Sequence, residues 1–170
     1  AGIIREMMAI GNAMNAERDP DVVLEMILSH ARTFTAADGG TLYLLNDTGD
    51  QLEFHVVHND SLDLRMGGTS SNPVSLPPIP VKSENGEYNC TNVSAYVAHS
   101  GEVVNLDDVY NVEEFNFQGV KDFDTEHNYR CTSMLVVPMR DHEDSIIGVL
   151  QLMNAKDRNT GKLVPFNREK

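Results

Sequence analysis

The sequence is poor in basic residues and has no long hydrophobic run. Its 170 residues include 13 lysines and arginines but 26 aspartates and glutamates, so the formal net charge is −13 and the pI is about 4.7. A negative field of this size repels phosphate groups, which excludes general binding to DNA, RNA or anionic lipid. No window approaches the ~18 apolar residues of a membrane span, and Arg5 and Glu6 interrupt the apolar start, which excludes a signal-peptide core. We therefore expect neither nucleic acid nor a membrane as a partner.

Cysteine is also scarce. Cys90 and Cys131 are far apart in the sequence, and neither belongs to a metal-binding spacing such as C-x-x-C. Unpaired thiols are typical of reducing compartments. We therefore expect two reduced cysteines in a cytoplasmic protein, with a disulfide or a redox pair as the alternative.

The composition is that of one folded domain. Hydrophobic residues make up 41% of the chain and charged residues 23%, and a chain of this size can bury a core without metals or disulfides. Residue 1 is alanine and the chain ends shortly after Asn167. We therefore interpret residues 1–170 as a single domain and as a fragment of a longer protein.

Helical periodicity predicts two helices at the start of the chain. In residues 3–17 the apolar positions cover more than one face, so that one face packs on a sheet and the other meets a partner helix. This predicts a homodimer through the N-terminal helix (residues 1–18), with packing inside one domain as the alternative. Asp19-Pro20 has the residue types of a helix start and predicts a second helix, which we expect to end within 36–40.

After residue 40 the pattern alternates with a period of two, which is typical of strands. Short polar turns join neighbouring strands, so the sheet is expected to be antiparallel and the fold class α+β. Asn92 or Thr91 predicts the start of a short helix that Gly101 ends, and Gly148 indicates a close backbone approach or a bulge. The expected strands are 41–45, 52–57, 79–82, 103–106, 133–139 and 146–154.

Residues 107–131 combine aromatic and acidic side chains. Between 107 and 126 there are seven acidic residues and a single lysine. A segment of this kind is neither a plain linker nor a plain core element. We interpret it as a folded flap with a short helix near 118–127.

Four motifs indicate a known family. They are residues 36–43 (AADGGTLY), 98–104 (AHSGEVV, followed by Asp107-Asp108), 133–139 (SMLVVPM) and 147–154 (IGVLQLMN). In this order they resemble a GAF domain, a small-molecule-sensing module of signalling proteins. The resemblance implies a GAF-like (profilin-like) fold, with about six antiparallel strands, N-terminal helices on one face and short helices plus the flap on the other.

The resemblance also implies a ligand site between the sheet and the flap. Aromatic faces with a few converging polar groups are what a small-molecule pocket needs. The alternative is that the aromatic side chains fill this space as core, which would leave a ligand-free structural dimerisation module. The candidate ligand-binding residues are His58, Asn59, Tyr96, Asn105, Asp107, Phe117, Asp122, Tyr129 and Ser133.

The acidic flap bears on the charge of the ligand, because a phosphate entering past it is repelled. We expect a neutral or cationic ligand, or an empty pocket, and not a nucleotide. Bilin attachment commonly uses a cysteine followed by histidine, whereas Cys90 and Cys131 each precede threonine. A lone histidine is usually structural, so haem is not expected either. His55 and His58 should face opposite sides of a strand, so we expect no metal site, and we find no catalytic constellation.

Narrower similarities concern the attached protein. A set of short motifs resembles GAF domains placed before HD-GYP phosphohydrolase or cyclase domains in bacteria: Asp107–Tyr110, Tyr129-Arg130, residues 148–155, Thr160-Gly161 and Pro165-Phe166. This implies a regulatory sensing domain of a bacterial signalling protein that controls an attached output enzyme, with a cyclic di-GMP phosphodiesterase as one candidate. The free methionine sulfoxide reductases are solitary GAF enzymes, but the chain lacks their clustered cysteines.

Asn154, Lys156 and Phe166 approach a further signature, that of cyclic-nucleotide phosphodiesterase GAF domains. In that family the signature braces the fold. The partial match therefore says little about cyclic-nucleotide binding.

Overall fold

The computed structural model of the chain describes residues 19–166, which form one antiparallel sheet of eight strands with helices on both faces. The strands are β1 (Ala37–Leu45), β2 (Gln51–Asn59), β3 (Leu64–Gly67), β4 (Ile79–Pro80), β5 (Val104–Leu106), β6 (Met134–Arg140), β7 (Ile146–Lys156) and β8 (Leu163–Val164). The helices are α2 (Pro20–Thr35), α3 (Val93–Ser100), α4 (Gln118–His127) and the short 3-10 helix η1 (Val109–Asn111). The expected α+β class is confirmed.

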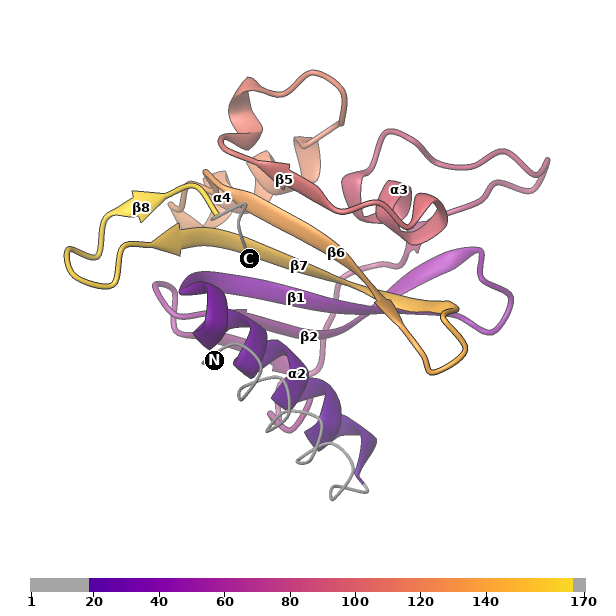
Figure 1. Ribbon diagram of the computed structural model, residues 1–170, viewed down its shortest axis with the longest axis horizontal. Coiled ribbons are helices and arrows are strands. Elements are labelled where there is room, and N and C mark those ends of the chain that lie inside the picture. The colour runs from indigo at the N-terminus through magenta and orange to yellow at the C-terminus, as the bar shows by residue number, and fades with distance from the viewer. Residues whose placement is uncertain (1–18, 167–170) are drawn as a thin grey trace.

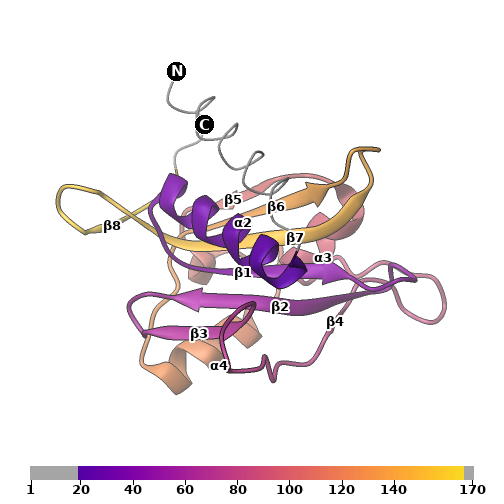
Figure 2. The ribbon, with the colours of Figure 1, turned by 90° about the horizontal axis from the view of Figure 1, so that it is seen from below.

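The strand order is β3-β2-β1-β7-β6-β5, with the short β4 paired to β2 and β8 paired to β7. The two longest hairpins therefore meet at the centre, where β1 pairs with β7. Figure 1 shows α2 on one face of this sheet and α3 and α4 on the other. From below, α2 lies over β1 in the middle of the sheet (Figure 2).

Local residue chemistry explains where α2 begins and ends. The Asp19 carboxylate accepts a hydrogen bond from the Asp21 N–H (3.0 Å), and Pro20 occupies the first helical position, as the sequence predicted. The helix ends when Ala36 adopts a left-handed conformation (φ 59°). Strand β1 then starts at once with Ala37.

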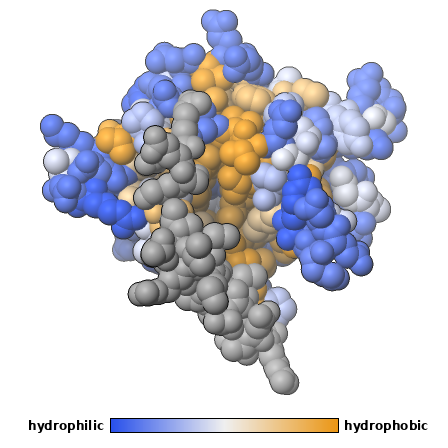
Figure 3. Space-filling model, viewed as in Figure 1, coloured by the Kyte–Doolittle hydropathy of each residue, from blue (hydrophilic) through white to orange (hydrophobic). Residues whose placement is uncertain are grey.

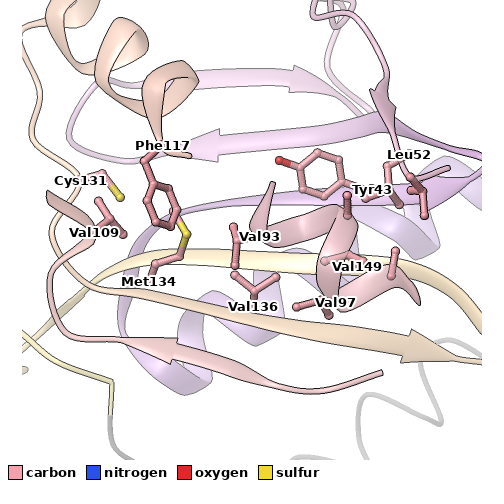
Figure 4. Packing of buried hydrophobic residues seen from close by; sticks show 13 residues of the cluster. Tyr43, Leu52, Val93, Val97, Val109, Phe117, Cys131, Met134, Val136 and Val149 are labelled. Carbon is pink, nitrogen blue, oxygen red and sulfur yellow. The ribbon is translucent and has the colours of Figure 1, made fainter. Parts of the chain in front are cut away.

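Side chains alternate across the sheet and build a separate core on each face. Leu42, Leu150 and Leu152 pack with Leu28 of α2. On the opposite face the larger core includes Tyr43, Val149, Met134, Phe117 and residues of α3. Figure 4 shows Phe117, at the start of α4, beside Cys131, Val109 and Met134. In Figure 3 hydrophobic residues gather in the middle of the view, with hydrophilic residues on both sides.

The expected start of the first strand was wrong. Residues 36–40 do not end the helix as a loop, because β1 already begins at Ala37 and includes Gly39 and Gly40. A Cβ atom on Gly40 would lie 2.8 Å from the Leu28 side chain. The glycine therefore lets α2 pack closely on the strand, a tertiary reason that a local pattern does not reveal.

Two short strands were not predicted. β3 and β8 lie at the margins of the sheet, and neither shows a long alternating pattern. The expected short helix near 118–127 is present, and the strand expected at 79–82 is present as Ile79–Pro80. Of the two expected caps of the next helix, Thr91 and Asn92, the structure has Asn92, and the helix ends at Gly101 as expected. The expected helix 3–17 and the residues from Asn167 onward lie outside the described residues.

Of the two features expected at Gly148, a close approach or a bulge, the structure shows a close approach, and this can be tested. A Cβ atom there would lie 2.2 Å from the Tyr43 carbonyl oxygen of the neighbouring strand. We expect Gly148→Ala to lower the free energy of unfolding by about 1–3 kcal/mol, as overpacking usually does. Urea denaturation measures the change. Gly119→Ala is the matched control, because its Cβ meets no atom within 4 Å and alanine favours a helix. Equal stability of both variants would contradict this account.

Candidate functional site

A cavity of about 400 Å³ lies between the sheet and the elements on the α4 side. This volume is within the range of about 300–1,000 Å³ that small-molecule sites occupy. β1, β2 and β7 form the floor, the segment 76–80 forms one wall, and the start of α3 and residues 116–124 form the roof. The apolar lining includes Phe54, Val57, Ile79, Val93, Phe117, Val120, Phe123 and Met153, and the polar lining includes Thr41, Asn59, Asn89, Asn92, Asn116, Asp124 and Gln151.

Two polar side chains lie side by side on the floor. Thr41 of β1 and Gln151 of β7 are register partners, and both side chains are buried. The Gln151 Oε1 atom accepts hydrogen bonds from Ser94 Oγ (2.9 Å) and from the Tyr43 hydroxyl (3.4 Å). These donors fix the amide so that its Nε2 group remains without a partner among the described residues. Burial raises the pKa of Tyr43, which keeps its hydroxyl protonated.

Asp124 holds the roof in place from α4. Its Oδ2 atom accepts hydrogen bonds from the Tyr110 hydroxyl (2.6 Å) and from the Cys131 N–H (2.9 Å). Its Oδ1 atom is buried and has no hydrogen-bond partner among residues 19–166. The bond to Asp124 raises the pKa of Tyr110 to about 12, so this tyrosine donates at all physiological pH values. Asp124 thus ties α4 to both ends of the flap and leaves one oxygen for another donor.

The lining carries little positive charge. Within the described part of the chain, no lysine or arginine lines this cavity. His58 borders it, but consecutive residues of a strand face opposite sides, and the His58 ring lies on the α2 side. There Arg32 Nη1 donates to His58 Nδ1 (3.1 Å), and His58 Nε2 donates to Glu25 (3.1 Å). The His58 ring is therefore engaged away from the cavity.

A second polar network joins the end of the flap to the sheet. The Asp38 carboxylate accepts hydrogen bonds from Lys156 Nζ (2.6 Å) and the Tyr129 hydroxyl (2.6 Å). Burial acts to raise the pKa of Asp38, but these bonds outweigh it and the pKa is lowered. Asn154 donates to the Tyr129 hydroxyl (2.7 Å) and accepts from the Thr132 N–H (2.6 Å). Asn154 and Lys156 therefore brace the fold in this chain.

The structure divides the nine predicted site residues among several places. Asn59 and Phe117 line the cavity, and His58 borders it with its ring turned away. Tyr129 belongs to the Asp38 network. The other five make contacts elsewhere: Tyr96 with Glu102, Asn105 with the Phe166 carbonyl, Asp122 with Gln118, Ser133 with the Val164 carbonyl, while Asp107 is exposed in the flap. Ligand binding by any of the nine stays a prediction.

Sequence reasoning missed six polar residues of the cavity lining, of which three are buried: Thr41, Asp124 and Gln151. The other three are Asn89, Asn92 and Asn116. Gln151 carried a readable signal, because it is a polar residue in the middle of the apolar run 146–153. A buried polar side chain needs partners, which marks its position as unusual. Asp124 carried no such signal, since it is one of seven acidic residues between 107 and 126.

No metal centre or membrane segment accompanies the cavity. Among residues 19–166 there is no group of three or more histidine, cysteine, aspartate or glutamate side chains that could hold a metal ion. In the same part of the chain, no helix is long and apolar enough to cross a membrane. The candidate site in residues 19–166 therefore consists of the cavity and the hydrogen-bonding groups that line it.

The fold agrees with comparisons to known proteins. A family model described as GAF domain matches residues 19–170, so the chain belongs to the GAF domain family. The Dual 3′,5′-cyclic-AMP and -GMP phosphodiesterase 11 of Drosophila melanogaster is 38% identical over 64 residues, which are 38% of this chain and 4% of that protein. The cGMP-specific 3′,5′-cyclic phosphodiesterase of Drosophila sechellia is 24% identical over 143 residues, which are 81% of this chain and 11% of the relative. The chain spans a small part of these relatives.

Solved structures show the same fold. The GAF domain of a phosphoenolpyruvate-protein phosphotransferase from Coxiella burnetii has a TM-score of 0.65 at 14% identity, covering 98% of this chain and 82% of that one. The corresponding domain from Acinetobacter has a TM-score of 0.63 at 15% identity, covering 98% and 81%. The free methionine-R-sulfoxide reductase of Neisseria meningitidis has a TM-score of 0.58 at 16% identity, covering 93% and 72%. At these identities the likeness establishes the fold.

The buried His58 predicts a loss of stability in mild acid. Burial lowers the pKa of His58 below its ordinary value of about 6.5. The folded state therefore favours the neutral His58 ring. The stability that this ring contributes is fully present above pH ~6.5 and is lost as the pH falls through the folded-state pKa. We expect urea denaturation to give a lower free energy of unfolding at pH 5.5 than at pH 7.5, and His58→Gln to flatten this dependence. His142→Gln, at a side chain that is 89% exposed, should not.

The two cysteines should differ in reactivity. Both are free, Cys90 is exposed and Cys131 is buried. Burial raises the pKa of the Cys131 thiol to about 12, so the reactive thiolate is rare there. We expect iodoacetamide at pH 8 to alkylate Cys90 in the folded chain and Cys131 only after unfolding in urea, as peptide mass spectrometry would show. Rapid alkylation of Cys131 in the folded chain would contradict the closed packing around it.

Proposed function

We propose that this chain is the small-molecule-sensing regulatory domain of a bacterial signalling protein and that it controls an attached output enzyme. The observation that supports this best is the cavity of about 400 Å³ with the buried Thr41 and Gln151 on its floor. A cavity that served only as core would be filled by side chains, because protein interiors are close-packed. The domain itself is proposed to be non-catalytic and cytoplasmic.

The nature of the output enzyme is also a proposal. The curated relatives named above are cyclic-nucleotide phosphodiesterases, of which the chain covers 4% and 11%. This supports an output domain that hydrolyses a cyclic nucleotide. The motifs at 107–110 and 148–155 favour an HD-GYP phosphodiesterase among such enzymes. A homodimer through residues 1–18 would carry the state of the cavity to that domain.

Native mass spectrometry of the freshly purified chain tests the sensing function. We expect an added mass from a co-purified small molecule in the wild-type protein. Val120→Trp should abolish it, because Val120 lines the cavity and tryptophan would fill the space. Val103→Trp is the matched control at a side chain that is 60% exposed, and it should keep the added mass. Bare masses for all three proteins would contradict sensing and favour a ligand-free dimerisation module.

A further inference from the structure

We infer that the cavity takes an uncharged planar heterocycle that carries a carbonyl group and a ring N–H, as a nucleobase or its nucleoside does, and that it rejects the phosphorylated form. This inference rests on the proposed function and specifies the ligand of that site. Its basis is the hydrogen-bonding pattern and the charge of the described lining residues.

The floor of the cavity offers donors to a ligand carbonyl. Gln151 is 7% exposed, and its Oε1 atom is already occupied by Ser94 and Tyr43. What remains for a ligand is the Nε2 group of Gln151, which is a hydrogen-bond donor. Thr41, its register partner, is 4% exposed, and its hydroxyl has no hydrogen-bond partner among the described residues. Both groups line the cavity and can donate, so a ligand acceptor at this pair would be stabilising.

The roof offers the complementary acceptor. Asp124 borders the cavity and is 4% exposed, and its Oδ1 atom lacks a partner among residues 19–166. A carboxylate oxygen accepts from an N–H group of the ligand. The same molecule would thus present its carbonyl to the floor and its N–H to the roof.

The remaining lining favours a flat ring. Phe54, Phe117 and Phe123 supply aromatic surface, and Pro77 and Pro78 supply rigid apolar surface. Aromatic side chains pack well against planar rings, in stacked or edge-on arrangements. Flat heterocycles satisfy this surface and the polar pair at once, whereas a flexible polar chain does not.

The charge of the site argues against a phosphate. No lysine or arginine among the described residues lines the cavity, and Asp124 places a carboxylate there. Between residues 107 and 126 the flap carries seven acidic residues and one lysine. The starts of α3 and α4 both lie on the roof, and helix N-termini attract phosphate. The Asn92 side chain already caps the start of α3, whereas Phe117 provides no side-chain cap at the start of α4. We weigh the carboxylate and the acidic flap above these partial charges.

Isothermal titration calorimetry with guanosine and with cyclic GMP tests the inference. The two probes share the base and differ in the charged phosphodiester. We expect guanosine to bind the wild-type chain at least tenfold more tightly than cyclic GMP. Equal binding, or tighter binding of cyclic GMP, would overturn the inference and indicate a phosphate site at one of the helix starts on the roof, α3 or α4.

Two variants separate the floor from the roof. Gln151→Glu keeps an acceptor for Ser94 and Tyr43 but removes the Nε2 donor, so guanosine affinity should fall at least tenfold. Gln51→Glu makes the same charge change at an exposed position and should leave it unchanged. Asp124→Asn keeps an acceptor for Tyr110 and Cys131, removes the negative charge, and should reduce the guanosine preference over cyclic GMP. The exposed Asp122→Asn should not. Thermal melting curves verify that each variant is folded.

The outcomes distinguish this inference from the proposed function. If neither probe binds while native mass spectrometry finds another bound molecule, sensing stands and the class of ligand named here is wrong. If neither probe binds and all proteins show bare masses, both proposals are wrong. If guanosine binds and Gln151→Glu binds it equally well, the assignment of the floor is overturned.

Discussion

The pairing of β1 with β7 is the constraint on which the rest of this structure depends. Each of these strands belongs to a hairpin, β1 with β2 and β7 with β6. Their register brings Tyr43 opposite Val149 and Thr41 opposite Gln151. The contact is close enough that Gly148 has no room for a side chain. Because side chains alternate along both strands, this one register decides which residues face α2 and which face the cavity.

The two faces of the sheet consequently have different chemistry. The α2 face is closed by leucine packing and by the buried bonds among His58, Arg32 and Glu25. The opposite face keeps polar groups at the cavity floor and holds α4 above them through Asp124. The cavity side therefore combines the larger hydrophobic core with hydrogen-bonding groups that remain available.

Much of this fold could be predicted from the sequence, and the site could not. Asp19-Pro20 predicted the start of α2, and Thr91-Asn92 predicted the start of α3 to within one residue, because capping is a local interaction. Gly148 signalled a close approach because glycine in a strand is locally unfavourable. His58 and Asn59 were both placed in the site, although adjacent residues in a strand face opposite sides. Asp124 depends on long-range partners, Tyr110 and Cys131, which no local pattern identifies.

Asn154 gives the domain a mechanical property. It adopts a left-handed conformation (φ 57°) near the end of β7 and grips the segment just after α4 through the Arg130 carbonyl, the Tyr129 hydroxyl and the Thr132 N–H. Tyr129 in turn contacts Asp38, two residues beyond the left-handed cap of α2. These hydrogen bonds therefore join the segment after α4, the end of β7 and the start of β1 just beyond α2. A displacement of α4 would be transmitted through them to the end of α2 and to the end of β7.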